Sequence, residues 1–297
     1  MVEINEVADQ VYRLEVLIPA MDSIFGAYLI RGEEGIVIEP GPAIAVPAIK
    51  DALKRLGIKE LAYIIPTHLH IDHAGGIGTL GGLYPHAEVL VHPAGAKHVI
   101  DPSRLIDGTR QVWGDDFDVG FGPILPVKES QVRIAGDGEI ILVNDRELEI
   151  LHAPGHAPHQ LVVFDRKVRG IFCGDALGIL PPIATPFPLP NTAPPGYDQE
   201  LYLATIERLR RSRADILFYS HGGVERDVDR LISMAADNTR AFSDIALESL
   251  REGATRDDVM RRVRDYISHR FGLEVEEKDL DMTVDGYIYY FEKKGLE

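Results

Sequence analysis

The segment that decides the fold spans residues 67–76 and reads Thr-His-Leu-His-Ile-Asp-His-Ala-Gly-Gly. It follows an apolar run at residues 61–65 that stops at Pro66, a pattern typical of a buried strand and its end. Imidazole and carboxylate groups are ligands for zinc, iron or manganese, and the end of a strand can spread alternate side chains around one point. Within six residues the segment places four candidate metal ligands: His68, His70, Asp72 and His73. It therefore predicts a metal site at the end of a strand.

Three further polar residues stand at the ends of later apolar runs. They are His156 in Ala-Pro-Gly-His, Asp175 in Phe-Cys-Gly-Asp, and His221 in Tyr-Ser-His-Gly-Gly. Each places a potential ligand on a loop that a rigid strand would hold. Taken singly, each of these residues is better explained as an ordinary polar group than as a ligand. Taken together with the first cluster, they favour one metal centre assembled from several loops.

The order H-x-H-x-D-H, followed by His, Asp and His, resembles the metallo-β-lactamase superfamily of hydrolases. The resemblance covers about residues 10–223 and implies an α/β fold, the four-layer αβ/βα sandwich, with its site at one edge between two sheets. It also implies two divalent metal ions. It assigns the first ion to His68, His70 and His156, the second to Asp72, His73 and His221, and a bridging role to Asp175.

Such a centre predicts a hydrolase. Two divalent ions carry more positive charge than two carboxylates cancel, so a bridging water should ionise near neutral pH, where metal-bound water has a pKa of about 7. The resulting hydroxide is the expected nucleophile, oriented by Asp72, which also relays a proton. Tyr197 is a candidate donor to the oxyanion, as a tyrosine is in lactonases of this superfamily. The expected substrate is a small-molecule ester, thioester, lactone or phosphodiester, and zinc is the expected metal, with iron and manganese as alternatives.

Two other residues are expected beside the ligands. The superfamily usually carries an aspartate after an early strand, and here the matching segment, residues 38–42, has Glu39. Glu39 is therefore expected to hold a metal ligand in place through a hydrogen bond. His159, three residues after His156, is expected to line the substrate pocket or to orient a ligand.

The part of the chain after Asp175 is similar to glyoxalase II only in outline. That thioesterase continues with a basic, glycine-rich stretch that binds glutathione, whereas residues 176–197 here carry no charge and contain seven prolines. Prolines prevent a continuous helix, so the segment is expected to be a stiff apolar loop rather than a membrane span. Five of its residues form either the wall of a pocket for an apolar acyl group or only a cover for the core: Ile179, Leu180, Ile183, Phe187 and Leu189.

Two alternative functions remain open at this point. Persulfide dioxygenases share the fold and much of the motif but use a single iron, so an oxidoreductase of that kind is one alternative. A lactonase that uses Tyr197 is the other.

The rest of the chain predicts two regions. Short β-branched runs alternate with helical patterns up to residue 223, whereas residues 224–297 are mostly helical, with Thr255 and Asp258 as an expected helix cap. We therefore expect a metallohydrolase domain at 1–223 and a helical appendage at 224–297, which serves either a homodimer or the substrate pocket. Residues 101–126 show no periodicity and are expected to form a surface loop or lid.

Composition limits the partners. The 297 residues include 31 basic and 47 acidic side chains, a net charge of −16, which disfavours nucleic acid as a ligand. The single cysteine, Cys173, excludes an internal disulfide and fits a cytoplasmic protein. The first ten residues lack the pattern of a signal peptide, and no membrane partner is expected.

Overall fold

The computed structural model describes residues 3–19 and 22–295. Their contacts divide the chain into two units, which we describe separately. The first unit comprises most of residues 1–174 together with residues 215–226, and it contains both β-sheets. The second unit comprises residues 153–158, 175–214 and 227–297. The domain boundary predicted at residue 223 stays a prediction. The two units are defined by their internal contacts, and each combines several separate stretches of the sequence, so they do not test a single boundary.

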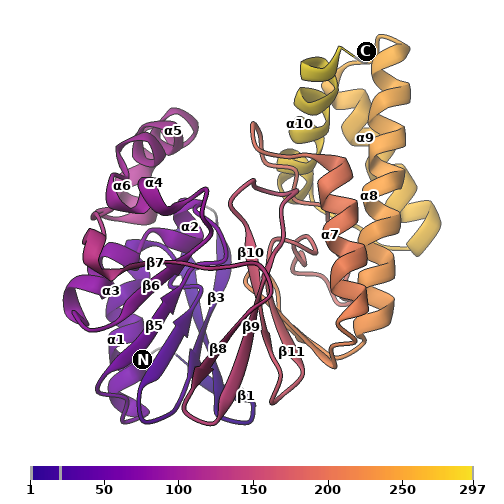
Figure 1. Ribbon diagram of the computed structural model, residues 1–297. Helices are drawn as coiled ribbons and strands as arrows, with labels where there is room; N and C mark the ends of the chain where they lie inside the picture. Colours follow the sequence, from indigo (N-terminus) through magenta and orange to yellow (C-terminus); the bar gives the residue numbers. More distant parts are fainter. Residues whose placement is uncertain (1–2, 20–21, 296–297) are drawn as a thin grey trace. The chain divides into compact units, whose positions relative to one another are not determined.

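The first sheet has its seven strands in sequence order, β1 to β7 (Figure 1). Strands β1 to β4 are antiparallel neighbours, and β4 to β7 pair in parallel. Parallel strands end at the same edge of a sheet, so the loops after β4 and β5 emerge side by side. The bounds are β1 Ile4–Ala8, β2 Val11–Ile18, β3 Ser23–Ile30, β4 Gly35–Ile38, β5 Leu61–Ile65, β6 Glu88–Val91 and β7 Val132–Ile134.

The second sheet has six strands in the order β13-β12-β11-β10-β9-β8. All neighbours are antiparallel except β11 and β12, whose parallel pairing brings the ends of both strands to one edge. The bounds are β8 Glu139–Val143, β9 Arg146–His152, β10 Leu161–Asp165, β11 Gly170–Gly174, β12 Ile216–Tyr219 and β13 Val224–Glu225.

The two sheets pack face to face through one apolar cluster. Alternate residues of each strand point into it, as the two-residue period of a strand requires. At its centre the ring of Tyr28 on β3 makes edge contacts with Phe172 on β11 and Phe218 on β12, at centroid distances of 5.2 and 5.4 Å. The hydroxyl of Tyr28 donates a hydrogen bond to the carbonyl of Tyr219 at 2.6 Å, so the one polar atom of this ring is satisfied.

Helices cover the other face of the first sheet (Figure 1). Helix α1 shows why: its buried residues, among them Val46, Ile49 and Leu53, recur at helical spacing and pack on the strands. The helices of this unit are α1 Val46–Arg55, α2 Ile71–Ala74, α3 Ile77–Leu83, α4 Ala96–Ile100, α5 Ser103–Trp113 and α6 Asp116–Phe121.

The prediction of a loop at residues 101–126 is wrong, because this stretch forms α5 and α6, whereas its alternative role as a lid stays a prediction. Leu105, Ile106 and Trp113 lie at helical spacing on α5 and pack against the core, but they are only partly buried, and the sequence analysis missed this pattern. The region is also held by aromatic rings: Phe117 and Phe121 of α6 are buried, and Trp113 of α5 packs edge-on against Phe121 at 5.5 Å.

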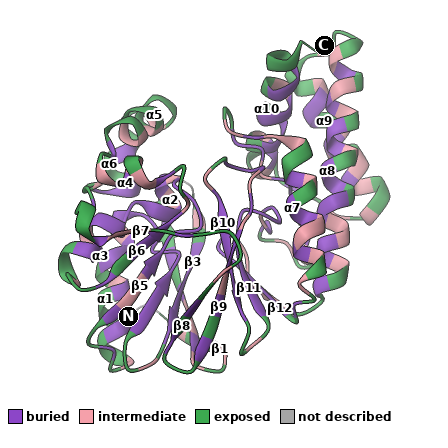
Figure 2. Cartoon of the chain, viewed as in Figure 1, coloured by how far each residue is buried: buried purple, intermediate pink, exposed green. Residues whose placement is uncertain are grey.

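The second unit is helical, with α7 Gln199–Arg211, α8 Val228–Arg251, α9 Arg256–Phe271 and α10 Glu277–Lys294. Figure 2 shows the buried residues of α8 along one side of the helix. Thr255 and Asp258 form the predicted capping box of α9. Residues 176–197 form neither a helix nor a long strand, as their prolines predict. The predicted α/β sandwich with C-terminal helices is thus confirmed. Among the described residues, no helix is both long and apolar enough to cross a membrane.

Candidate metal centre

The loop after β5 carries the first pair of candidate ligands. β5 ends at Ile65, and the chain reaches α2 at Ile71, so residues 66–70 form a short extended connection. In it, Nε2 of His68 lies 3.0 Å from Nδ1 of His70. His68 is buried, whereas His70 is partly exposed. Two imidazole nitrogens that face each other at this distance are suited to share one cation.

A second group of ligand atoms converges between α2 and the loop after β12. Nε2 of His221 lies 3.0 Å from Oδ2 of Asp72 and 3.3 Å from Nε2 of His73, and the remaining distance, from His73 to Asp72, is 3.4 Å. Zinc at its usual bond lengths of about 2.0–2.1 Å separates tetrahedral ligands by about 3.3–3.4 Å. The three atoms therefore already have the spacing that one divalent ion requires, and the donor set fits a metal.

Glu39, which follows β4, holds His73 in this group. Its Oε2 accepts hydrogen bonds from Nδ1 of His73 and, at 2.9 Å, from Oγ of Ser220. Its Oε1 accepts one from the backbone N–H of Thr67 at 2.6 Å. A carboxylate can only accept here, so Nδ1 of His73 carries the proton and Nε2 is left to bind a metal.

The backbone at Glu39 is unusual as well. Its φ of +60° lies in the left-handed region, which a residue with a Cβ adopts at a cost of about 1–2 kcal/mol. The Glu39 N–H donates to the carbonyl of Ile65 at 2.9 Å, which ties the ends of β4 and β5 together. Strain of this kind persists where the surrounding contacts over-determine it, as they do around this fully buried side chain.

The loop that carries His221 is fixed to β3. The N–H of Gly26 donates to the carbonyl of Ser220 at 2.7 Å, and Phe25 forms an isolated bridge with His221. The Phe25 ring also makes edge contacts with the rings of His73 and His221, at 5.0 and 5.4 Å. These contacts restrict the rotation of both imidazoles, so the geometry of the group is set before any ion binds.

The family of this chain follows from a comparison of its sequence with models of known protein families. The family model described as the metallo-β-lactamase superfamily matches residues 27–221, a span that contains every candidate ligand. The chain belongs to the metallo-β-lactamase superfamily.

Curated relatives in this superfamily carry several names. The acyl-coenzyme A thioesterase MBLAC2 of Homo sapiens is 28% identical over 170 residues, which cover 50% of this chain and 57% of that protein. An N-acyl homoserine lactonase from Bacillus sp. is 28% identical over 180 residues, which cover 58% of this chain and 61% of that protein. The matches to the first curated relatives span only 56–62% of the length of those proteins.

Solved structures show the same fold. A metallo-β-lactamase family protein from Thermus thermophilus superposes with a TM-score of 0.70 at 21% identity and covers 98% of this chain and 95% of its own. A metallo-β-lactamase superfamily protein from Sulfolobus tokodaii superposes with a TM-score of 0.64 at 21% identity, and the match covers 79% of this chain and 86% of that protein.

The second unit contains the other two ligands that the metallo-β-lactamase motif predicts. His156 lies in the loop 153–158 and Asp175 comes directly after β11, and both side chains are buried. Nε2 of His156 lies 3.5 Å from Oδ2 of Asp175. Asn191, which the sequence analysis missed, donates a hydrogen bond to that same oxygen.

His159 lies in the first unit, beside the His68 and His70 pair. Its ring centroid is 6.4 Å from that of His68 and 6.3 Å from that of His70. Burial, and after it the charge of His70, lower the pKa of His159 to about 3, so its ring is neutral at physiological pH. Its Nδ1 accepts a hydrogen bond from the N–H of Leu69 at 3.3 Å. The predicted alternatives for this residue, lining the pocket or orienting a ligand, both stay predictions.

Tyr197 lies in an aromatic cluster of the second unit. Its ring contacts those of Tyr202, Tyr287 and Tyr290 at 5.5–5.6 Å, and its hydroxyl donates to that of Tyr287 at 3.5 Å. Burial raises the pKa of Tyr197 well above its ordinary value, so the hydroxyl stays protonated. Its predicted role as a donor to the substrate stays a prediction.

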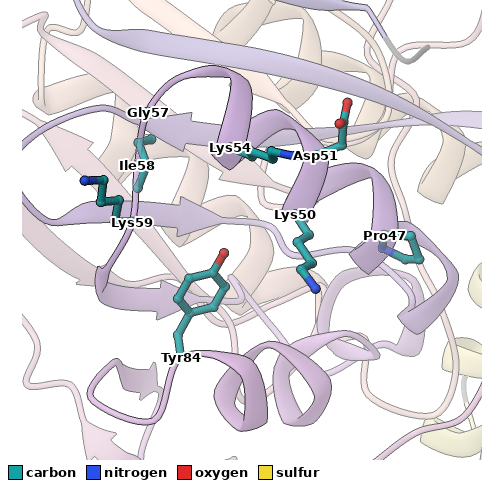
Figure 3. A pocket seen from close by; sticks show the side chains of 8 residues that line it. All are labelled: Pro47, Lys50, Asp51, Lys54, Gly57, Ile58, Lys59 and Tyr84. Atoms are coloured by element: carbon teal, nitrogen blue, oxygen red, sulfur yellow. The ribbon is translucent and has the colours of Figure 1, made fainter.

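A shallow cavity of about 540 Å³ lies on the first unit, beside the C-terminal half of α1 (Figure 3). Three lysine side chains, Lys50, Lys54 and Lys59, and the ring of Tyr84 line it. Asp51 is the one carboxylate in its lining, and none of the predicted metal ligands belongs to it. This cavity therefore has no part in the metal chemistry.

Proposed function

We propose that this chain is a dinuclear metal-dependent hydrolase of a small-molecule acyl thioester. The observation that carries the proposal is the convergence of Asp72, His73 and His221, whose ligand atoms lie 3.0–3.4 Å apart. The superfamily pattern extends this group to a pair of ions, with His68, His70 and His156 at one ion and Asp175 as the bridge. Zinc suits this set of five imidazoles and two carboxylates, and iron and manganese accept the same ligands.

Chain continuity supports the inclusion of His156 and Asp175. The loop that carries His156 has only six residues, and both of its neighbours, His152 and His159, belong to the unit that holds the other ligands. Asp175 follows Gly174, the last residue of β11, without any spacer. In the sequence, His156 is thus three residues from His159, and Asp175 adjoins Gly174, both residues of that unit.

The chemistry divides between the metals and the chain. When bound, a divalent metal pair lowers the pKa of a water to about 7 and polarises the carbonyl of the substrate. Asp72 is at the metal-facing end of α2, where its carboxylate orients the nucleophile and accepts a proton for delivery to the leaving group. Glu39 keeps His73 in the ligating tautomer. Tyr197 stays protonated and is a further proposed donor to the oxyanion, a role in which its one O–H would leave the long bond that it donates to Tyr287.

Relatives favour an acyl thioester among the possible substrates. One curated relative is an acyl-coenzyme A thioesterase and another is a hydroxyacylglutathione hydrolase, 30% identical over 165 residues. The net charge of −16 disfavours nucleic acid as a substrate and does not distinguish among small-molecule esters. The homoserine lactonase relative makes a lactone the second candidate.

A substrate panel tests the proposal. The chain, loaded in turn with zinc, manganese and iron, is assayed with acyl-coenzyme A thioesters of several chain lengths, an acyl homoserine lactone and a phosphodiester. We expect thioester hydrolysis that is lost in Asp175→Ala, with the circular dichroism spectrum retained. Cleavage of the phosphodiester alone, or oxygen consumption with a persulfide by a singly iron-loaded chain, would overturn it.

A further inference from the structure

Asn191 joins the two candidate ligands of the second unit. Its backbone carbonyl accepts a hydrogen bond from Nδ1 of His156 at 2.8 Å, and its side-chain Nδ2 donates one to Oδ2 of Asp175 at 2.7 Å. One residue thus contacts both side chains with two separate groups. His156 and Asp175 are almost completely buried, so neither can replace these bonds with bonds to water.

Each bond determines how its partner can bind a metal. A carbonyl only accepts, so Nδ1 of His156 must carry the proton and Nε2 keeps its lone pair. The side-chain amide of Asn191 must turn its nitrogen toward Asp175, because the reversed amide would place two oxygens against each other, and the resulting hydrogen bond restrains Oδ2 of the carboxylate. The amide oxygen Oδ1 of Asn191 is buried and has no hydrogen-bond partner among the described residues. No donor there therefore favours the reversed orientation of the amide.

Helix α10 holds the segment that carries Asn191. Oγ1 of Thr283 donates to the carbonyl of Pro190 at 2.7 Å, and Oγ1 of Thr192 donates back to the carbonyl of Thr283 at 2.9 Å. Gly286, one turn further along α10, lies so close that a Cβ there would sit 1.9 Å from the carbonyl oxygen of Thr192. The residues on either side of Asn191 are therefore clamped to one helix.

The apolar loop before Asn191 is closed on itself. Ile179 and Leu189 exchange two backbone hydrogen bonds, at 2.9 and 2.8 Å. Gly178 has φ +81°, and a Cβ there would lie 2.2 Å from the carbonyl oxygen of Leu189. The closure returns the chain toward Asp175, which lies 16 residues before Asn191 in the sequence.

We propose that Asn191 is a positioning residue for the metal centre, and that α10 acts on the metal through it. The inference rests on the proposed function, in which His156 and Asp175 are metal ligands. Groups that orient ligands in this way change metal affinity by about 10- to 100-fold when they are removed. The C-terminal helices then serve the metal centre in addition to any role in a pocket or a dimer.

Zinc affinity of the metal-free chain, measured by competition with a chromogenic chelator, tests the proposal. We expect Asn191→Ala to weaken the affinity of at least one zinc by about 10-fold or more. Asn238→Ala is the matched control, because Asn238 donates to the carbonyl of Pro188 on the same segment, at 2.8 Å, without contacting a ligand. This control should lose stability to urea without a comparable loss of zinc affinity.

Two further variants make the result decisive. Thr283→Val should weaken zinc binding and Thr283→Ser, which keeps the hydroxyl, should restore it; this pair applies even if Asn191→Ala does not fold. Equal zinc affinity in Asn191→Ala and the unaltered chain, with Asp175→Ala losing zinc, would overturn the role of Asn191 alone. Unchanged zinc binding in Asp175→Ala would overturn the proposed function itself.

Discussion

Glu39 accepts a hydrogen bond from Nδ1 of His73, and both side chains are fully buried. The two residues are 34 positions apart in the sequence: Glu39 directly follows β4, and His73 lies on α2, which comes after β5, the parallel neighbour of β4. The contact links the sheet directly to a candidate metal ligand. Glu39, one methylene longer than the aspartate that the superfamily resemblance implies here, makes this contact from a left-handed backbone.

Replacing Glu39 by Gln should weaken metal binding while leaving the fold in place. The amide removes one of the two acceptor oxygens, so either His73 or the N–H of Thr67 loses its partner. We expect a fall in zinc affinity of about 10- to 100-fold, measured by chelator competition. Glu34→Gln, the same change at an exposed position, is the control. Equal zinc affinity in the two variants would contradict the role of Glu39.

Replacing Gly174 by Ala should destabilise the chain more than the same change at Gly57. Both glycines have positive φ, but a Cβ at Gly174 would lie 2.2 Å from Oγ1 of Thr67, whereas a Cβ at Gly57 meets nothing within 4 Å. Gly57→Ala should therefore lower the free energy of unfolding only by the cost of a residue with a Cβ in the left-handed region, about 1–2 kcal/mol. Gly174→Ala adds overpacking of about 1–3 kcal/mol. Urea denaturation of both variants measures the difference, and equal midpoints would refute it.

Arg146 forms a buried ion pair with Asp165, between the start of β9 and the end of β10. Arg146→Met leaves the carboxylate buried without its countercharge and should cost about 3–5 kcal/mol. Arg166→Met is a matched control, because Arg166 pairs with Glu147 and Glu149 at the surface, where such pairs contribute about 0–1 kcal/mol. Free energies of unfolding in urea decide the point, and a loss at Arg146 no larger than at Arg166 would be inconsistent with a tight buried pair.

His92 should make the chain less stable at acid pH. Burial, and after it the neighbouring His152 ring at 4.2 Å, lower the pKa of His92 to about 4 from its ordinary value of 6.5. Its Nδ1 also accepts a hydrogen bond from the N–H of Ala94 at 3.1 Å, which protonation of that nitrogen would break. Between pH 6.5 and 4 the unfolded chain binds a proton that the folded chain does not, so stability falls as pH falls through this window.

The variant His92→Gln isolates this effect. The difference in unfolding free energy between the variant and the unaltered chain should shift in favour of the variant as the pH is lowered from about 8 to about 5. Because both proteins keep the same metal ligands, the titration of those ligands cancels in the difference. A difference that is independent of pH would exclude the effect.

The sequence predicts those elements whose ends carry strong local signals. β5 has the predicted bounds, because it is a short apolar run at residues 61–65 that stops at Pro66. The helices α5 and α6 were missed, because the partly buried Leu105, Ile106 and Trp113 of α5 have a helical spacing that the polar residues and glycine at 107–111 obscure. The start of α9, in contrast, was predicted correctly, because its cap is a local sequence pattern of Thr255 and Asp258.

The candidate site shows a similar division. The candidate ligands in residues 68–73 lie within one motif, so their side-chain types alone predict a metal centre. Glu39 was predicted from its place after an early strand, and its contact with His73 supplies the physical reason. Asn191 was missed, because half of its contribution comes from a backbone carbonyl, which every residue has. Ser220 was missed because a serine beside a histidine carries no specific signal.

The number of metal ions per chain tests the central claim most directly. Elemental analysis of the untagged chain, after resupply of zinc, manganese or iron and removal of excess metal, should give two divalent ions per chain. Asp175→Ala, which removes the proposed bridge, should bind little metal. One ion per chain that remains single after resupply, or no bound ion at all, would contradict the dinuclear hydrolase.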